Sequence, residues 1–408
     1  MSTLSIAPYF PFSQMKITRQ SVNADATMAV VVLKPDERFH PVCHACRTPA
    51  HGVHSEETRA VRDLNLASAQ VSLNCTYRKV FCPQCERVMV EDTGVFMPYS
   101  RVTIRLARLV HALCCVMTVK DVAEHFDLDW KTVKNIDKAF LEEQYGHPDY
   151  SGLRVLAVDE ISIKKGHRYV TVVLNYETGA VVWLGAERKK ETLKKFYALL
   201  TLEQRAAIEA VAMDMWDNYI EATQEALPNA AIVFDQFHVV SSFGKVIDQV
   251  RIAEFNKARA KDRAVFKGAK YLLLKNRCNV RTRSEREQLD ELLSLNRAIS
   301  TIYILKDKLK HIWFYTSQTW AIKAIREWLA LARTVRHHAV ADFCRMLRVH
   351  ARGILNHCLF PIHTSVLEGV NNKIKVIKRI AYGYHDLAYF SLKVIQAFQP
   401  RTVQPNGR

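Results

Sequence analysis

Residues 154–163, Arg-Val-Leu-Ala-Val-Asp-Glu-Ile-Ser-Ile, form the stretch that decides the fold, because their apolar positions follow the period of a β-strand. A second strand is expected over 167–175 and a third over 180–184, and the turn at 177–179 makes the three consecutive strands antiparallel. The chain then alternates, with a helix over 190–200 that could extend to 209, a strand ending at 213, a helix over 218–227 and a strand over 231–234. This pattern predicts an α/β domain.

The order of these elements, βββαβαβ, predicts a ribonuclease-H-like mixed sheet. Residues from about 241 to 362 are helical by composition and lack strand patterns, so we expect an all-α insertion there. A last helix is expected to begin near Leu367. Pro148 and Gly152 mark the start of this domain, which we place at 152–400.

Acidic residues stand where such a fold would gather them. Asp159 lies in the first strand between apolar residues, a position that is unfavourable for a carboxylate unless it is paired or binds a cation. Asp214 follows the fourth strand, at the edge where open α/β sheets bind ligands. On the last helix, one face carries Glu368, Asn372, Lys375 and Arg379, and the opposite face carries Val370, Ile374, Ile377 and Ala381.

Carboxylates from separate elements can hold two Mg²⁺ ions, or Mn²⁺, about 4 Å apart for phosphoryl transfer. We therefore predict Asp159, Asp214 and Glu368 as catalytic residues, with Lys375 and Arg379 holding the phosphate backbone of DNA. Each acid also has an ordinary explanation, since a strand Asp is often an ion-pair partner and Glu368 suits the first turn of a helix.

Two other acids compete for the role of Asp214. Asp217 follows the same strand, but it is predicted to cap the helix that starts at Asn218. Asp235 ends the fifth strand, and we expect it to support the site together with His238 and Asn372. Asp214 is preferred because it directly follows the apolar residues of its strand.

The spacing Cys43-x-x-Cys46, thirty-five residues, Cys82-x-x-Cys85 predicts one structural Zn²⁺ in a zinc ribbon over 41–90. Cys75 belongs to an alternating strand pattern with Val71, Leu73 and Tyr77, so it is predicted to be a core residue. His51 or His54 could replace one cysteine as a ligand. Residues 1–40 show no periodic pattern and stay unassigned.

A helix-turn-helix domain is predicted over 97–146, with helices over 119–126 and 130–141 and Asp129 as the N-cap of the second helix. The recognition helix of this motif enters the major groove by its N-terminal residues, which here are Lys131, Thr132 and Lys134. A plain helical hairpin is the alternative. The preceding zinc ribbon and the basic chain favour the DNA-binding interpretation.

Composition points to a nucleic-acid partner. The 408 residues contain 58 Lys+Arg and 41 Asp+Glu, a formal charge of +17, and the segment from Lys245 to Arg286 alone has a net charge of +9. A hydrophobic fraction of 49% and few Gly and Pro exclude a disordered or collagen-like chain. No apolar run is long enough to span a membrane and no signal peptide is recognised, so we expect a cytoplasmic, nucleoid-associated protein.

Five motifs together resemble the ISL-three (ISL3) family of bacterial insertion-sequence transposases, over about residues 40–395. They are Val158-Asp159-Glu160 with Lys165-Gly-His-Arg-Tyr169, Asp214-Met-Trp-Asp217-x-Tyr219, Phe234-Asp-Gln-Phe-His238-Val, Tyr271-Leu-Leu-Leu-Lys275-Asn276, and Glu368-Gly-Val-Asn-Asn372-Lys-Ile-Lys375-x-Ile-Lys378-Arg379-x-Ala-Tyr-Gly383. The resemblance implies a DDE transposase with Mg²⁺-dependent strand cleavage and transfer, whose acids would be Asp159, Asp214 and Glu368. Asp235 and His238 resemble an Asp-x-x-His motif that supports the site in related transposases.

The leading hypothesis is therefore a DDE transposase that binds the terminal inverted repeats of its own element as a homodimer or higher oligomer. One alternative is a non-catalytic DNA-binding repressor derived from a transposase, although a repressor has no use for three converging acids. The other is a ribonuclease-H-like structure-specific nuclease, which would not need two N-terminal DNA-reading modules.

Overall fold

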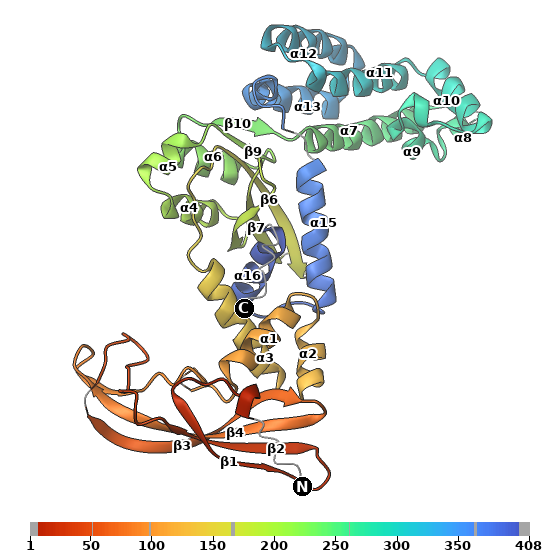
Figure 1. Cartoon of the computed structure of the whole chain (residues 1–408). Helices are drawn as coiled ribbons and strands as arrows, with labels where there is room; N and C mark the ends of the chain where they lie inside the picture. Colours follow the sequence, from red (N-terminus) through yellow and green to blue (C-terminus); the bar gives the residue numbers. More distant parts are fainter. Residues whose placement is uncertain are drawn as a thin grey trace. The chain divides into compact units, whose positions relative to one another are not determined.

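A computed structural model describes residues 7–50, 52–97, 99–164, 168–260, 262–362 and 365–399. The chain is a mixed α/β protein that divides into two compact units, Met1–Gln144 and Tyr145–Arg408 (Figure 1). Within the described ranges, no helix combines the length and the apolar character needed to cross a membrane.

The first unit is built on a five-stranded sheet in the order β1-β2-β4-β3, with β5 also paired to β4. Its strands are β1 (Met15–Val22), β2 (Met28–Pro35), β3 (Val53–Leu66), β4 (Ala69–Cys82) and β5 (Arg87–Val90). As predicted, Val71, Leu73, Cys75 and Tyr77 are buried along β4, because alternate residues of a strand face the same side of the sheet.

Residues 1–40, for which the sequence predicts no element, contribute two strands to this sheet. β1 pairs antiparallel with β2, and β2 pairs parallel with β4, so both belong to the same core as the ribbon strands. Ala29, Val31 and Leu33 alternate as buried residues in β2. The apolar run over 28–33 hides this alternation, because the residues between the buried ones are apolar as well.

Three helices complete the first unit: α1 (Ile104–Cys114), α2 (Val119–Phe126) and α3 (Trp130–Tyr145). Thr118 and Asp121 form a capping box at the start of α2. Asp127 ends α2 in a left-handed conformation. The Asp129 carboxylate accepts the backbone N–H groups of Lys131 and Thr132, so Asp129 caps α3 as predicted.

The second unit contains a five-stranded mixed sheet in the order β10-β9-β6-β7-β8. Its strands are β6 (Val155–Lys164), β7 (Arg168–Asn175), β8 (Val181–Ala186), β9 (Ala210–Met213) and β10 (Ala231–Phe234). β6, β7 and β8 pair antiparallel in sequence order, whereas β9 and β10 run parallel to β6. The three antiparallel strands and the two later strands therefore lie where the sequence pattern placed them.

Helices cover both faces of this sheet (Figure 1). On one face, Leu156 and Val158 pack with residues of α4 (Lys190–Leu199) and α6 (Asp217–Ala226). On the other, Ala157 and Ile161 pack with residues of α15 (Ser365–Ile380) and α16 (Leu387–Phe398). The alternation along β6 thus produces a three-layer α/β/α arrangement.

A helical segment connects β10 to α15. It contains α7 (Gln236–Lys257), α8 (Arg263–Phe266), α9 (Ala269–Leu274), η2 (Arg277–Asn279), α10 (Arg283–Leu295), α11 (Arg297–His311), η3 (Ile312–Phe314), α12 (Gln318–Ala332), η4 (Arg333–Val335), α13 (His338–Val349), α14 (Ala351–Leu355) and η5 (Asn356–Cys358). The rings of Phe243, Trp328 and Phe343 pack together in its core, with centroids 4.9–5.6 Å apart. Asn356 donates to the Ile232 carbonyl at 2.8 Å and so joins the end of the segment to β10.

Two predicted boundaries differ from the structure. The helical segment begins at Gln236 rather than near 241, because Asp235 caps α7 immediately after β10. The helix over 190–200 does not continue to 209; it ends at Leu199, and α5 (Leu202–Ala207) starts from a capping box between Thr201 and Gln204.

Candidate active site

Strand register aligns three aspartates across the sheet of the second unit. β6 and β9 pair Ala157 with Ala212, so Asp159 and Asp214 stand two residues further along adjacent parallel strands. β9 and β10 pair Met213 with Phe234, so Asp214 and Asp235 each follow a paired residue. Since neighbouring strands lie about 4.8 Å apart, Asp159, Asp214 and Asp235 form a row, called here the acid row.

Strand periodicity also directs the three side chains to one face. Ala157 and Ala212 pack with residues of α15 and α16, and Asp159 and Asp214 follow each of them by two positions. Val233 precedes Asp235 by two positions and packs with Ala210, which lies on the same face of β9 as Ala212. The acid row therefore belongs to the face that α15 covers.

His238 brings a positive charge to the acid row from the first turns of α7. Its Nδ1 lies 3.0 Å from Oδ2 of Asp214, and its Nε2 lies 3.6 Å from Oδ2 of Asp235. Asp235 also accepts the Phe237 backbone N–H at 2.7 Å as the N-cap of α7, which sets where the helix starts. His238 thus contacts both Asp214 and Asp235, and the supporting role of Asp235 and His238 stays a prediction.

The electrostatics of the acid row follow from burial and from these neighbours. The hydrogen bond with Asp214 raises the pKa of His238 to about 9, so the imidazole is protonated at neutral pH. Burial opposes ionisation of Asp214, but the His238 hydrogen bond and charge outweigh it and lower the pKa of Asp214. Burial raises the pKa of Asp235 to about 6 and also raises the pKa of Asp159, with neighbouring acids adding in the same direction.

α15 reaches Asp159 through Asn371. The Asn371 Nδ2 group donates to Oδ2 of Asp159 at 2.6 Å. About two turns later on α15, Lys378 Nζ donates to the Ser162 carbonyl at 3.3 Å. α15 therefore runs alongside β6 in the same direction. Asn372, the amide predicted to support the site, is exposed instead. That prediction rests on the face that Asn372 shares with Glu368, but the helix turns Asn371 toward the sheet.

Glu368 lies one turn before Asn371 on α15 and is exposed. Among the described residues, no hydrogen bond or ion pair joins Glu368 to the acid row. Lys375 and Arg379 are also exposed, on the side of α15 away from the buried Val370 and Ile374. The helix thus has the two faces that were predicted, and its polar face is open to solvent.

Asp217 does not cap α6, contrary to the prediction. The N-cap position is taken by Trp216, and Asp217 is the first helical residue, exposed and without a side-chain cap hydrogen bond. At that position its charge is favoured by the positive end of the helix dipole.

A stack of side chains on the opposite face of the sheet, the face that α4 and α6 cover, was not predicted. The Arg188 guanidinium lies 4.4 Å from the Tyr169 ring centroid and 5.0 Å from that of Trp216, and it donates to Glu160 at 3.0 Å. Two members of the stack could have been suspected from the sequence, because Glu160 is next to Asp159 and Trp216 is two residues after Asp214. Arg188 was out of reach of sequence reasoning because it comes from the loop after β8.

The donor set of the acid row suits a hard divalent cation. Three carboxylates lie on one face of the sheet. Burial and the neighbouring acids raise the pKa of Asp159 and of Asp235. A bound cation would lower both pKa values again, because it stabilises the ionised carboxylates. Among the described residues, however, only the cysteine group below has its ligand atoms all within 4.8 Å of one another. His238 Nδ1 lies against Oδ2 of Asp214.

The four cysteines predicted to bind zinc do converge. Cys43, Cys46, Cys82 and Cys85 have their sulfur atoms within 4.8 Å of one another, and Cys46 and Cys82 are 3.4 Å apart. Two come from a loop before β3, Cys82 ends β4, and Cys85 lies in the turn between β4 and β5, which brings the distant Cys-x-x-Cys pairs together. Four thiols at this spacing suit a tetrahedral zinc ion.

The alternative zinc ligands differ in their surroundings. Cys75 is fully buried in the sheet core, where burial raises the pKa of its thiol to about 12, as expected of a core residue. His54 is not part of the cysteine group; its Nδ1 lies 3.3 Å from Ser55 Oγ. His51 lies outside the described residues.

The helix-turn-helix prediction is supported by α2 and α3, which pack through Val122, Ala123, Phe126 and Val133. Lys131 is exposed at the start of α3, whereas Thr132 and Lys134 are half-buried. Trp130, beside them, is 53% exposed, and Lys131 Nζ lies 5.8 Å from its ring centroid.

Comparison with known proteins agrees with this architecture. A family model described as a transposase, that of the ISL3 DDE domain, matches residues 156–394, and a model described as the helix-turn-helix domain of transposase family ISL3 matches residues 94–141. The first match alone covers more than half of the chain. The chain belongs to the ISL3 family of transposases.

Individual ISL3 relatives extend the similarity over most of the chain. The transposase for insertion sequence element IS1001 of Bordetella parapertussis is 40% identical over 371 residues, which cover 90% of this chain and 91% of that protein. The transposase for insertion sequence element IS1557 of Mycobacterium tuberculosis is 27% identical over 354 residues, or 80% of this chain and 78% of that protein. The resemblance proposed from five motifs is confirmed.

Proposed function

We propose that this ISL3-family chain is a DDE transposase that binds the terminal inverted repeats of its element and catalyses Mg²⁺-dependent strand cleavage and transfer. The observation that carries the proposal is the acid row, in which strand register places Asp159, Asp214 and Asp235 side by side. The strand order and the helical segment between β10 and α15 support a ribonuclease-H-like fold with an all-α insertion.

In this proposal, Asp159 and Asp214 are two ligands of the catalytic metal and Glu368 is the third. A pair of Mg²⁺ ions would activate the attacking oxygen and stabilise the leaving one. Asn371 orients Asp159 through its hydrogen bond, and His238 fixes the Asp214 carboxylate until a cation replaces it. Glu368 stands one turn from Asn371, so a modest movement of α15 would bring its carboxylate toward the same place.

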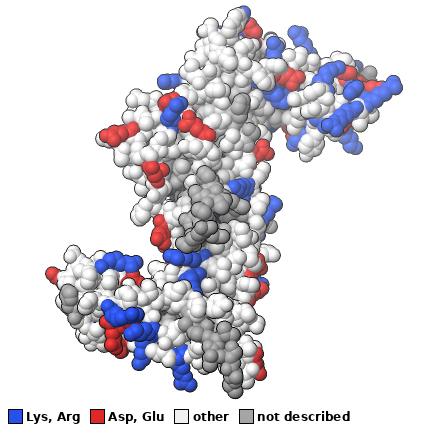
Figure 2. All heavy atoms as spheres, viewed as in Figure 1, with Lys and Arg blue, Asp and Glu red and all other residues white. Residues whose placement is uncertain are grey.

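DNA binding is proposed for three parts of the chain. Lys131, Thr132 and Lys134 lie at the start of α3, where a recognition helix contacts bases. Lys375 and Arg379 lie on the exposed face of α15 and would contact the backbone. Figure 2 shows Lys and Arg gathered over the part of the insertion that Figure 1 labels α8, α9 and α10. We also propose one structural Zn²⁺ at the cysteine group, a nucleoid-associated cytoplasmic location, and a homodimer or higher oligomer holding both DNA ends.

A cleavage assay tests the catalytic residues. A plasmid carrying the terminal repeats is incubated with the full chain and Mg²⁺, and nicking is followed by gel electrophoresis. We expect Asp159→Asn, Asp214→Asn and Glu368→Gln each to abolish nicking while repeat binding, measured by gel shift, stays within a few-fold of wild type. The losses should not add, because each removes part of one site.

Asp217→Asn is the matched control, because Asp217 is exposed, follows the same strand and makes no side-chain cap. It should nick like the wild type. Nicking by Asp214→Asn together with an inactive Asp217 or Asp235 variant would move the second acid to that neighbour. Repeat binding without nicking by the wild-type chain would instead favour the repressor, and nicking independent of the repeats would favour the nuclease.

A further inference from the structure

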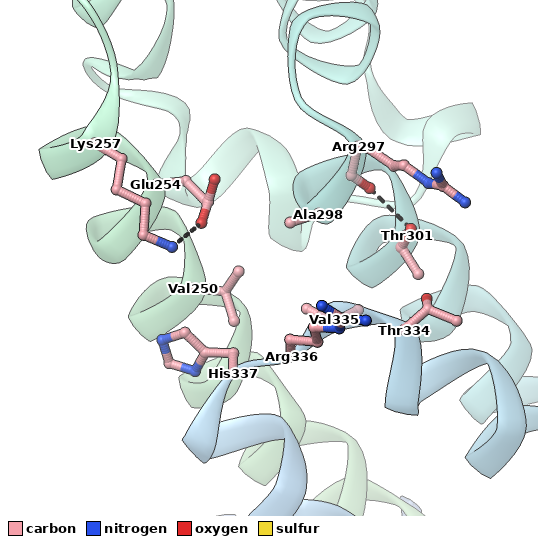
Figure 3. A pocket seen from close by; sticks show the side chains of 10 residues that line it. All are labelled: Val250, Glu254, Lys257, Arg297, Ala298, Thr301, Thr334, Val335, Arg336 and His337. Atoms are coloured by element: carbon pink, nitrogen blue, oxygen red, sulfur yellow. Dashed lines mark hydrogen bonds and ion pairs between the residues drawn. The ribbon is translucent and has the colours of Figure 1, made fainter.

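A pocket of about 280 Å³ lies inside the helical segment, away from the acid row (Figure 3). One wall comes from α7, through Val250, Glu254 and Lys257, and the opposite wall comes from the start of α11, through Arg297, Ala298 and Thr301. The third side is the chain from Thr334 to His337, between η4 and α13. Its volume is near the lower end of the roughly 300–1,000 Å³ of small-molecule sites.

The lining of this pocket is cationic. Lys257, Arg297 and Arg336 face a single acid, Glu254, whose carboxylate is already engaged by Lys257 and by Asn296, each at 2.8 Å. Arg297 and Arg336 are exposed at the rim, and within the described ranges no ion pair or side-chain hydrogen bond engages either guanidinium. Both guanidinium groups are therefore available to an anion from outside the described protein.

The backbone around the pocket adds to its positive potential. α11 begins at Arg297 and α13 begins directly after His337, so two helices of 15 and 12 residues direct their N-termini toward this pocket. His337 Nδ1 accepts the Ala339 backbone N–H at 3.2 Å, which leaves the proton on Nε2 available to donate. Burial lowers the pKa of His337, so the neutral ring is the prevailing form.

Arg336 itself stands in an unusual backbone conformation. Its φ of 30° and ψ of 47° lie in the left-handed region, which a residue with a Cβ rarely adopts. This conformation turns the chain from η4 into α13. A glycine would adopt this conformation without strain, so the backbone at residue 336 should accept a change to glycine.

We propose that this pocket binds a phosphate group through Arg297, Arg336 and the two helix N-termini. Guanidinium groups make paired hydrogen bonds to phosphate, and the dipoles of the two helices add positive potential at their N-termini. The phosphate belongs to the backbone of bound DNA or to a free phosphate compound, and the two sources share this chemistry. The DNA source rests on the proposed function, whereas binding of a free phosphate does not.

The test uses the full zinc-loaded chain and a double variant, Arg297→Ala with Arg336→Gly. Glycine suits the positive φ of residue 336, so the variant removes the guanidinium without adding backbone strain. The matched control is Lys308→Ala with Arg326→Ala, which removes two exposed charges from α11 and α12 outside the pocket. Circular dichroism checks folding, and the single variants Arg297→Gln and Arg336→Lys replace the double variant if it does not fold.

Two measurements then separate the sources. Fluorescence anisotropy of a repeat-bearing duplex at several salt concentrations should give a salt slope shallower by about 0.9 for each DNA phosphate that the pocket variant no longer binds, with no comparable change in the control. If the phosphate comes from a free compound, calorimetric titration with inorganic pyrophosphate in the absence of DNA should give a binding signal that the pocket variant loses. In the DNA case, methylphosphonates placed one at a time along the repeat should include a position that weakens wild-type binding and leaves binding by the pocket variant unaffected.

A salt slope that changes in the pocket variant assigns the site to DNA, whether or not pyrophosphate also binds. Pyrophosphate binding that the pocket variant loses, with an unchanged salt slope, assigns the site to a free compound. The proposal is overturned if the pocket variant matches the wild type in both measurements, or if the control variant changes as much as the pocket variant. Failure of the wild type to bind DNA would refute the proposed function, and the pyrophosphate titration would still decide the pocket.

Discussion

The ion pair between His238 and Asp214 should make the stability of the second unit depend on pH. Their contact at 3.0 Å raises the pKa of His238 to about 9 from an ordinary value of 6.5. A rise of this size corresponds to roughly 3 kcal/mol at 1.36 kcal/mol per pH unit. The two side chains are 36% and 43% exposed, and solvent screening of such a pair reduces the contribution to about 1 kcal/mol.

The sign follows from proton binding by the two states. Because the folded pKa of His238 lies above the unfolded value, the folded protein holds the extra proton, and the contribution is fully present below about pH 6.5. It is lost as the pH rises through about 9. His238→Gln can still donate a hydrogen bond to Asp214 but carries no charge, so it should lower the free energy of unfolding by about 1 kcal/mol at pH 6.5 and by much less at pH 9.5.

Urea unfolding of the full chain without added Mg²⁺, followed by tryptophan fluorescence at pH 6.5 and 9.5, measures this difference. His337→Gln is the matched control, because burial lowers the pKa of His337 and its contribution is therefore nearly constant over that range. If the difference between wild type and His238→Gln is the same at both pH values, or larger at pH 9.5, the charged pair does not exist as described.

Further outcomes follow from the other sites. Cys43→Ser or Cys85→Ser should release one zinc per chain, measured by elemental analysis, and unfold the first unit while the second keeps its fold, since the cysteine group closes only that sheet; wild-type protein purified without any zinc would refute the site. Lys131→Ala should weaken binding to the terminal repeats more than binding to random DNA in a gel shift, and an equal loss on both would show that Lys131 contacts only phosphates. Lys306 is buried against the Leu273 carbonyl, and burial lowers its pKa to about 8, so the unfolded chain binds more protons between about pH 8 and 10.5. The difference in the free energy of unfolding between the wild type and Lys306→Met, measured in urea titrations, should therefore move in favour of the wild type by up to about 3 kcal/mol as the pH rises over that window.

The sequence alone determined most of the secondary structure of the second unit. Apolar alternation and turn residues predicted the strands that became β6 to β10, and Asp129 marked the start of α3 in the first unit. These features depend on neighbours within a few residues, so a local pattern is sufficient to predict them. The paired Cys-x-x-Cys spacing likewise predicted which residues meet, because thiols at that spacing have few other uses.

Only the tertiary structure decided the contacts within the site. Sequence spacing placed Glu368 and Asn372 on one face of α15, but the packing of Val370 and Ile374 against the sheet rotates Asn371 toward Asp159 and leaves Asn372 exposed. The side-by-side position of Asp159, Asp214 and Asp235 required the pairing of β6, β9 and β10, which are distant from one another along the chain. Hydrophobic periodicity specifies which face of an element is buried, whereas the rotation of a helix on a sheet and the register of distant strands depend on side-chain packing across the whole core.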